Sequence, residues 1–363
     1  MLATLARCRA RHTGVASTCL HPIMIRNLLL ALLATLLAGC ASTPPTPAVA
    51  TSPATIATPA LPPLRIGLAL GGGAAKGFAH IGVIKMLEAN GIKPVIVTGT
   101  SAGSVVGALY ASGMDAYALQ ERAVALDEAQ IRDVSLFSGG LIKGQKLEDY
   151  VNAQVGNRPI ERLPIPFAAV ATRLEDGQPT VFRRGNVGQA VRASSAVPGV
   201  FEPVTIGRWH YVDGGVVSPV PVDAARELGA DFVIAVDIGS KATSGDASPS
   251  NLLGNVNQSI RIMGQRLAAA ELKRADVVIR PAVNDIGPAD FSQKQRAILE
   301  GERALQAALP QIRDRLAAVL TARAQRARAA AQAQQASAAT PVAECTPHRS
   351  WTTFWRSVCS KTE

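Results

Sequence analysis

The stretch Gly-Thr-Ser-Ala-Gly at residues 99–103 decides the expected fold, because it separates two segments of different character. Residues 92–98, which precede it, are mostly apolar and β-branched, a composition typical of a buried strand. Residues 102–112, which follow it, are mostly small. We therefore predict a strand, a sharp turn and a helix, with Ser101 at the turn.

The two glycines that flank this turn, Gly99 and Gly103, have a steric explanation. A G-x-S-x-G elbow is tight and crowded by neighbouring backbones, so a Cβ at either position would clash. The elbow holds the serine hydroxyl at a helix N-terminus, where partial positive charge favours a developing negative charge. The same pattern also arises by chance in chains of this length, so the motif alone is equally compatible with a plain turn.

A second glycine cluster, Gly-Gly-Gly-Ala-Ala-Lys-Gly at residues 71–77, lies between a strand-like segment and a helical pattern that runs to residue 90. It lacks the Gly-Lys-Ser/Thr ending of a nucleoside triphosphate loop, and neither register of the dinucleotide fingerprint fits it. The remaining role for such a loop is to offer backbone N–H groups to an oxyanion. The serine after the very next strand favours that role.

The order strand, loop, helix, strand, elbow, helix predicts a parallel sheet with helices on its faces. Residues 138–144 are expected to form a flexible loop that could border a site. The other expected elements are strands at 64–70, 167–172, 179–183 and 231–237, a helix at 115–137, a helix opening at 220–222, and helices over 291–336 that are interrupted at Pro310.

The composition fits one large domain or two modest ones, because 48% of the 363 residues are hydrophobic. The formal net charge of +10 does not indicate a nucleic-acid partner. Residues 1–39 hold four arginines and no acidic residue, and much of the remaining surplus lies in the arginine-rich C-terminal region. Aromatic residues make up only 4% and no basic–aromatic run occurs, so we exclude nucleic-acid binding.

Residues 24–40 are expected to direct export. A charged start at Met24 precedes an apolar run that is too short to span a membrane, which needs about twenty residues. The run ends in Leu-Ala-Gly-Cys, which resembles the lipobox of bacterial lipoproteins. The resemblance implies translation from Met24, cleavage before Cys40 and acylation of its thiol. With Ala41 in place of an aspartate, we expect a lipid anchor in the outer membrane of a bacterial cell envelope, facing the periplasm.

Three motifs together resemble the patatin-like phospholipase family: residues 72–77, 99–103 and the Asp-Gly-Gly at 213–215. The run Ala-Ser-Ser-Ala-x-Pro-x-x-Phe-x-Pro at 193–203 is similar to bacterial members of that family. The resemblance covers residues 64–240. It implies a three-layer α/β/α fold with a mainly parallel central sheet, and hydrolysis of lipid acyl esters by a Ser–Asp dyad without a metal or other cofactor.

Carried over to this chain, the resemblance makes Ser101 the nucleophile and Asp213 its base. It assigns the oxyanion hole to the N–H groups around Gly72, Gly73 and Ala74. Ala74 departs from the family pattern, because many members have a third glycine there, and its methyl group is expected to narrow the approach to the hole. The remaining motif residues are Gly99, Gly103, Lys76, Gly77, Gly214 and Gly215.

The histidines also favour a dyad, since only His80, His210 and His348 follow Cys40. The chain order of an α/β-hydrolase triad would leave His348, which lies in a polar tail. His210 is expected at a strand edge and His80 in a structural role. Asp213 would then accept the serine proton itself, which requires partial desolvation to raise its pKa.

Three functions remain open at this point. The first is a membrane-tethered phospholipase A or lysophospholipase, whose partner is a membrane lipid. The second is a carboxylesterase, thioesterase or acyltransferase with the same dyad, and the third is a non-catalytic lipid-binding lipoprotein of the envelope. Loose candidates for phosphate contact are Arg183, Arg184 and Arg192.

The domain organisation predicted from these patterns has five parts: a signal peptide region at 1–39, a disordered linker rich in Pro, Thr and Ala at 40–63, the hydrolase domain at 64–285, a helical extension at 286–340 and a tail at 341–363. In an oxidising periplasm, Cys345 and Cys359 of the tail could close a small loop.

Overall fold

The computed structural model describes residues 61–131, 133, 142–241 and 252–339. The predictions for the signal region, Cys40, most of the linker, His348 and the two tail cysteines therefore lie outside the described residues. So do residues 138–141 of the loop expected to border a site.

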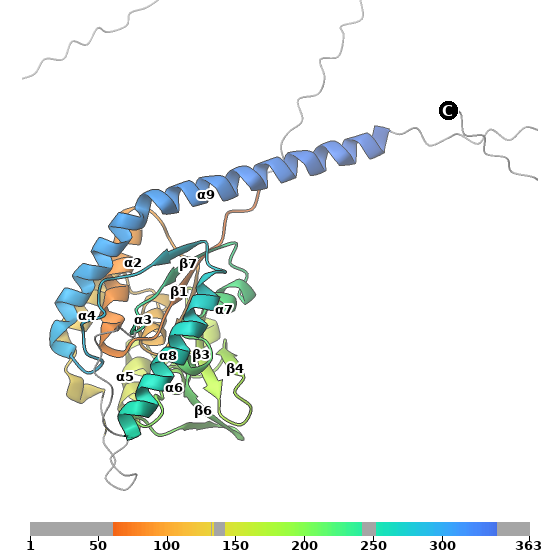
Figure 1. Ribbon diagram of the computed structural model, residues 1–363. Coiled ribbons are helices and arrows are strands. Elements are labelled where there is room, and N and C mark those ends of the chain that lie inside the picture. The colour runs from red at the N-terminus through yellow and green to blue at the C-terminus, as the bar shows by residue number, and fades with distance from the viewer. Residues whose placement is uncertain (1–60, 132, 134–141, 242–251, 340–363) are drawn as a thin grey trace, which may run out of the picture. The chain divides into compact units, whose positions relative to one another are not determined.

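One mixed sheet of eight strands forms the centre of the domain, in the order β5-β6-β3-β2-β1-β7-β8, with β4 paired to β3 (Figure 1). Neighbours within the run β3-β2-β1-β7-β8 are parallel, while β4 and β6 are antiparallel to β3 and β5 is antiparallel to β6. The strands are β1 (Ile66–Leu70), β2 (Ile96–Thr100), β3 (Phe167–Arg173), β4 (Pro179–Phe182), β5 (Val204–Ile206), β6 (Trp209–Asp213), β7 (Phe232–Val236) and β8 (Val277–Ile279).

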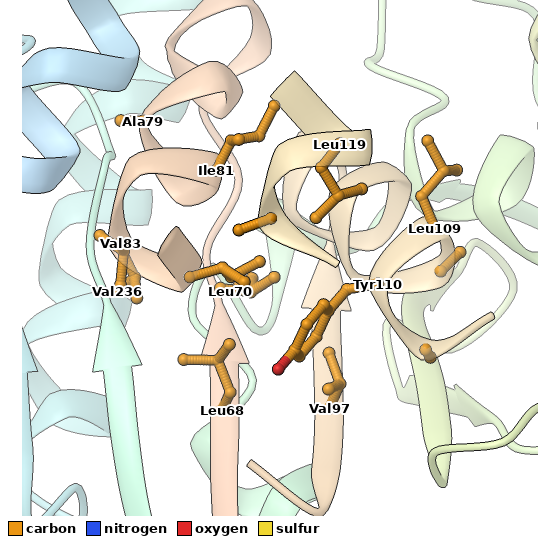
Figure 2. Packing of buried hydrophobic residues seen from close by; sticks show 14 of the residues in the cluster. Leu68, Leu70, Ala79, Ile81, Val83, Val97, Leu109, Tyr110, Leu119 and Val236 are labelled. Carbon is orange, nitrogen blue, oxygen red and sulfur yellow. The ribbon is translucent and has the colours of Figure 1, made fainter. Parts of the chain in front are cut away.

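Helices cover both faces of the sheet, so the predicted three-layer α/β/α fold is confirmed. Alternate residues of a strand point to opposite faces. Accordingly, Leu68 and Leu70 of β1 join the core cluster under α2, α3, α4, α5 and α9 (Figure 2), while Ala69 joins the cluster under α7 and α8. The α-helices are α2 (Ala79–Ala89), α3 (Ala102–Ala111), α4 (Ala116–Ala125), α5 (Gln145–Gln154), α6 (Val187–Ser194), α7 (Val222–Glu227), α8 (Leu252–Leu272) and α9 (Lys294–Ala339).

The register of the sheet brings the motifs to one edge. Leu70, at the end of β1, pairs with Gly99 near the end of β2, so the glycine loop and the elbow leave the sheet side by side. On the next strands, Thr100 pairs with Val170, and Ala171 pairs with Asp213. Motifs far apart in the sequence thus meet at the carboxyl edge of the parallel strands, where α/β folds bind their ligands.

Two sequence-based expectations about elements were wrong, and some elements were not foreseen. The helix expected over 115–137 ends at Ala125, because Leu126 has an extended backbone. Strand β8 was not foreseen, since its three residues are too few to give a periodic signal. The interruption expected at Pro310 does not occur: α9 continues through this exposed proline, because buried Leu309 and Ile312 hold both sides of it against the core.

The long helix α9 is packed into the domain core through its first half. Ala297, Ile298, Leu305, Leu309 and Ile312 all belong to the main core cluster. The contact with α2 is backbone to backbone, since a Cβ on Gly82 would lie 1.9 Å from the carbonyl oxygen of Ile298. Part of the segment predicted as a helical extension is therefore core structure. Among the helices described, none has an apolar stretch that could cross a membrane.

Candidate active site

The elbow holds Ser101 in a strained backbone conformation. Ser101 links β2 to α3 with φ +53° and ψ −126°, a region that side-chain-bearing residues rarely adopt. The flanking glycines make this turn possible. A Cβ on Gly99 would lie 2.3 Å from the carbonyl oxygen of Gly103, and one on Gly103 would lie 2.1 Å from that of Leu70. The steric explanation predicted for both glycines is confirmed.

Asp213 ends strand β6 and is fixed by its neighbours. Its N–H donates to the carbonyl of Ala196 at 2.8 Å, and its own carbonyl accepts from the Thr172 hydroxyl at 2.8 Å. The side-chain Oδ1 accepts from the N–H of Gly215 at 2.7 Å. The chain can turn away directly afterwards because Gly214 is so close to β3 that a Cβ would lie 2.1 Å from the carbonyl oxygen of Val170.

The structure brings Ser101 and Asp213 together in a buried setting. Both residues are 7% exposed. Burial raises the pKa of the Asp213 carboxyl to about 6, and the nearby Ser101 hydroxyl and the hydrogen bond from the Gly215 N–H oppose the rise. The second carboxylate oxygen, Oδ2, makes no hydrogen bond of good geometry in the described part of the chain. The approach of the two side chains is thus looser than a formed hydrogen bond.

The glycine loop lies against Ser101 and leaves two backbone donors unused. A Cβ on Gly72 would lie 3.2 Å from Cβ of Ser101. The N–H of Gly72 itself donates to the carbonyl of Pro219 at 3.0 Å, so the predicted role of Gly72 as an oxyanion donor must be corrected. In the described ranges, the N–H groups of Gly73 and Ala74 have no hydrogen-bond partner. Ala74 has φ +50°, a region that glycine prefers.

The described histidines lie away from this pair. His80 is buried, its Nε2 lies 2.8 Å from the Gly71 carbonyl, and burial lowers its pKa to about 4. The neutral ring therefore donates to Gly71 and supports the glycine loop. His210 is exposed, and its Nδ1 lies 2.7 Å from Glu175. Within the described ranges, no histidine hydrogen-bonds to Ser101 or Asp213.

The two remaining residues of the glycine motif have different surroundings. Lys76 is buried, and its Nζ donates to the Ser240 hydroxyl at 2.6 Å, while burial and the charge of Arg261 lower its pKa. Gly77 packs against α3, where a Cβ would lie 2.7 Å from that of Ala102. Lys76 thus bonds to the segment after β7, whereas Gly77 keeps η1 (Ala74–Phe78) close to the elbow.

An almost entirely apolar cavity of about 340 Å³ opens beside Ser101. Ser101, Ser195 and Tyr150 are the polar side chains in its lining. Ile142, from the loop predicted to border a site, is part of the wall. The other lining residues are Ala74, Gly77, Phe78, Ala102, Val105, Val106, Leu126, Ile131, Leu147, Val197, Val200, Phe201, Pro288, Ala289 and Phe291. Such a cavity suits a flexible hydrocarbon chain whose polar end reaches the serine.

Residues 68–226 match the sequence model of patatin-like phospholipase. This domain belongs to the patatin-like phospholipase family. An uncharacterised NTE family protein of Mycobacterium tuberculosis is 38% identical over 205 residues, which cover 54% of this chain and 56% of the relative. The protein named lysophospholipase nte1 of Aspergillus fumigatus is 34% identical over 181 residues, covering 48% of this chain and 12% of the relative.

Among solved structures, VipD from Legionella pneumophila aligns with a TM-score of 0.44 and 16% identity over 68% of this chain and 67% of that chain. The type III effector ExoU aligns with a TM-score of 0.38 and 16% identity over 70% of this chain and 53% of that chain. This chain spans about half the length of the mycobacterial relatives that it matches.

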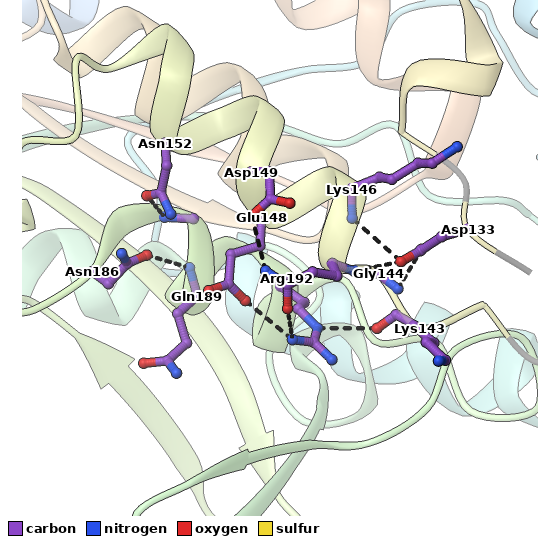
Figure 3. A network of polar contacts seen from close by, with 12 residues as sticks. Asp133, Lys143, Gly144, Lys146, Glu148, Asp149, Asn152, Asn186, Gln189 and Arg192 are labelled. Carbon is purple, nitrogen blue, oxygen red and sulfur yellow. Dashed lines mark hydrogen bonds and ion pairs between the residues drawn. The ribbon is translucent and has the colours of Figure 1, made fainter. Parts of the chain in front are cut away.

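A polar network braces two walls of the cavity in the patatin-like domain (Figure 3). The Arg192 guanidinium of α6 donates to the Lys143 carbonyl at 3.0 Å and pairs with Glu148 of α5 at 3.1 Å. Asp133 accepts from the N–H groups of Gly144, Gln145 and Lys146 at the start of α5. Because Arg192 is bonded within the protein, its suggested role in phosphate contact has no support.

Arg183 and Arg184, the other two candidates for phosphate contact, are exposed and do not line the cavity. Among the described residues, no group of three or more His, Cys, Asp or Glu side chains is arranged to hold a metal ion.

Two further buried polar groups of the domain, Ser194 and Glu271, were missed by sequence reasoning. Ser194 accepts the N–H of Ser101 at 2.9 Å and donates to the Val170 carbonyl at 2.6 Å, so it fixes the elbow to β3. The motif at 193–203 pointed to this segment without assigning it a role. Glu271 of α8 accepts from the Ser218 hydroxyl at 2.5 Å and the Val220 N–H at 2.9 Å. Its burial raises its pKa to about 7, and nothing in the sequence signalled it.

Proposed function

We propose that this protein is a serine hydrolase that cleaves carboxylic esters of lipids, with Ser101 as nucleophile and Asp213 as base. One observation carries the proposal: a serine on a strained elbow faces a buried carboxylate whose pKa is raised to about 6. A carboxyl group with this pKa is mostly ionised at neutral pH, yet it is a stronger base than an ordinary aspartate.

In the acylation step, the Ser101 oxygen attacks the ester carbonyl carbon while its proton passes to Asp213. The unused N–H groups of Gly73 and Ala74 are suited to stabilise the negative charge that develops on the carbonyl oxygen. The tetrahedral intermediate collapses, the proton moves from Asp213 to the leaving alcohol, and an acyl-serine remains. Water then releases the fatty acid in a second step.

The cavity supports a lipid substrate. Its apolar lining would hold an acyl chain and leave the ester group at Ser101. We therefore place a phospholipase A or lysophospholipase activity first, in line with the name of the Aspergillus relative. A carboxylesterase, thioesterase or acyltransferase would use the same residues on other substrates.

The test compares wild-type protein with Ser101→Ala and with Ser112→Ala, a control serine at the end of the same helix α3. We expect fluorophosphonate labelling and fatty acid release from lysophosphatidylcholine for the wild type and the control. Ser101→Ala should lose labelling and at least about 10³-fold of the activity. Activity on short soluble esters alone would indicate a carboxylesterase. A wild-type protein with neither labelling nor release would contradict the proposal and favour the lipid-binding lipoprotein.

We also propose that Cys40 carries a lipid anchor that holds the domain in the bacterial cell envelope, at the outer membrane. The lipobox-like sequence before Cys40 supports this location. Expressed in a bacterial host, the protein should incorporate labelled palmitate and sediment with membranes, because acyl chains contribute about 0.8 kcal/mol per buried methylene. Cys40→Ala should abolish both. Equal membrane association of the variant would contradict an anchor at this residue.

A further inference from the structure

We infer that the Ser195 hydroxyl, together with Oδ2 of Asp213, binds the water that hydrolyses the acyl-Ser101 ester. The inference rests on the proposed function and assigns to the site one more residue that touches a reacting molecule. It concerns only the second half of the reaction, in which the acyl group leaves the enzyme.

Ser195 lies between two residues that are hydrogen-bonded to Ser101 and Asp213. The residue before it, Ser194, accepts the N–H of Ser101 at 2.9 Å. The residue after it, Ala196, accepts the N–H of Asp213 at 2.8 Å. Ser195 is therefore held between the nucleophile and the base by a hydrogen bond on each side. Its side chain lines the same cavity as Ser101.

The Ser195 hydroxyl makes no hydrogen bond within the described part of the protein. Ser195 ends α6, where its N–H bonds to the carbonyls of Val191 and Arg192 and its carbonyl accepts from Val197. The side-chain oxygen, in contrast, is buried without a hydrogen-bond partner in the described part of the protein, and the residue is 7% exposed. Buried hydroxyls are nearly always bonded, so an unbonded one that faces a cavity indicates a ligand.

The oxygens Oγ of Ser195 and Oδ2 of Asp213 fit the hydrogen bonds that a reacting water needs. A water that attacks an acyl-serine must direct a lone pair at the carbonyl carbon while its two hydrogens point to acceptors. Oδ2 of Asp213 and Oγ of Ser195 are both buried acceptors without a partner among the described residues. Ser195 lines the cavity, and most of the cavity wall is apolar and offers water little. Two such acceptors, linked through Ala196, provide what the water needs.

Hydrolysis of the acyl-Ser101 ester passes through one tetrahedral intermediate. The water oxygen bonds to the acyl carbon, and one water proton passes to Asp213. The tetrahedral intermediate collapses with cleavage of the bond to the Ser101 oxygen, which takes the proton back from Asp213. The products are a free fatty acid and the original serine. Ser195 is unchanged, because it only accepts a hydrogen bond from the second water hydrogen.

This role differs measurably from that of an oxyanion donor. A donor to the carbonyl oxygen would assist formation and hydrolysis of the acyl-enzyme alike, since both pass through a tetrahedral intermediate. A residue that binds the attacking water acts on hydrolysis alone. The two rates can be separated with a p-nitrophenyl ester, whose release reports acylation in the first turnover and the slower step thereafter.

The experiment uses the full chain with p-nitrophenyl octanoate, as wild type, Ser195→Ala, Ser195→Thr and Ser259→Ala. Ser259 is an exposed serine on α8 whose hydroxyl bonds to Asn255, and it serves as the control. In Ser195→Ala we expect first-turnover release within about twofold of wild type and steady-state turnover lower by about tenfold, the effect of one hydrogen bond. Quenched samples analysed by intact mass should show a larger acylated fraction of Ser101. Ser195→Thr, which keeps the hydroxyl, should restore most of the turnover.

Two results would overturn the inference: an acylated fraction that does not rise in Ser195→Ala, or acylation that slows as much as turnover. Thermal unfolding of Ser195→Ala should match or exceed that of the wild type, so misfolding is not confused with either result. Failure of the proposed function has a different signature, because then even the wild type would show neither an acylated Ser101 nor fluorophosphonate labelling.

Discussion

Two buried carboxyl groups lie on opposite sides of the sheet, and their surroundings differ in one respect. Asp213, at the end of β6, and Glu271, on α8, are each 7% exposed, and burial raises the pKa of both. Both oxygens of Glu271 accept a hydrogen bond, from Ser218 and Val220. Only one oxygen of Asp213 does so in the described structure, from Gly215.

This difference in hydrogen bonding indicates a structural role for Glu271 and leaves Asp213 available to accept a proton. Glu271 fastens the segment that follows Asp213 to α8, and Ser218 in that segment also accepts the Thr100 hydroxyl next to Ser101. Asp213 bears the same desolvation and keeps one oxygen available for a proton. A raised pKa alone would not tell the two apart, whereas the hydrogen-bond partners do.

The largest effect is expected from substitution of Asp213. Asp213→Asn should lower ester hydrolysis by at least about 10³-fold, because the amide cannot accept the Ser101 proton. Stability should move in the other direction. At pH 8 we expect the free energy of unfolding to increase by about 2 kcal/mol, because a buried charge is removed. Urea unfolding and fatty acid release measured on one preparation check both statements, and a fall in stability would show that the carboxylate is structural after all.

The next effect concerns Glu271 and should have the opposite pattern. Glu271→Ala leaves the Ser218 hydroxyl and the Val220 N–H without an acceptor, so the free energy of unfolding at pH 6 should fall by about 2–3 kcal/mol. Activity of the folded protein should fall by less than about tenfold, since Glu271 has no role in proton transfer. A loss of activity as large as that of Asp213→Asn would remove the distinction between the two groups.

The smallest effect is a pH dependence that sharpens the comparison. Folding raises both pKa values, so these two carboxyl groups bind more protons in the folded chain than in the unfolded chain between about pH 4 and pH 7. Their contribution to the free energy of unfolding should therefore fall as pH rises through this window and level off above it. Buried His80, whose pKa is lowered to about 4, contributes in the opposite direction below about pH 6.5. Catalytic efficiency should rise with pH, half-maximal near pH 6, because the base we propose is the ionised form of Asp213.

Glu271→Gln is the matched variant for this dependence. It should remove the fall in stability that Glu271 causes as pH rises to about 7, and it should leave the midpoint of the activity profile unchanged. The other charges that affect the pKa of Glu271 are Asp223, which raises it, and Arg274, which lowers it. Asp223 and Arg274 form an ion pair with each other, so their effects on the pKa of Glu271 oppose each other. The ion pair itself does not involve Glu271 and is kept in the variant. A shift of the activity midpoint would show that Glu271 is coupled to the base.

The elements that sequence reasoning predicted well carry a local signal. Gly99 and Gly103 bracket the elbow because backbone crowds both positions, and that requirement is visible in five consecutive residues. Ser101 and Asp213 were paired through the family resemblance and through the shortage of histidines. The structure adds that they meet in a buried setting, which no spacing of motifs could establish.

The parts that escaped prediction depend on contacts between distant segments. The N–H of Gly72 is unavailable because Pro219 accepts it, and nothing near Gly72 in the sequence indicates this bond. The cavity wall at Pro288 and Phe291 and the buried Glu271 are likewise defined only after the chain folds. Pro310 illustrates the reverse case, in which a strong local signal yields to the packing of Leu309 and Ile312.

The strand directions have a consequence for how the domain could meet a bilayer. The chain enters β1 at Ile66, at the end of the sheet opposite to Ser101, and Arg323 of α9 bonds to the Pro62 carbonyl at this same end. A domain anchored through Cys40, as proposed above, would thus be attached at the end of the sheet opposite to Ser101. The roughly twenty residues between Cys40 and Pro62 could extend to about 70 Å. That length exceeds the diameter of a domain of this size. An enzyme anchored in this way could therefore reorient and act on lipids of the membrane to which it is anchored.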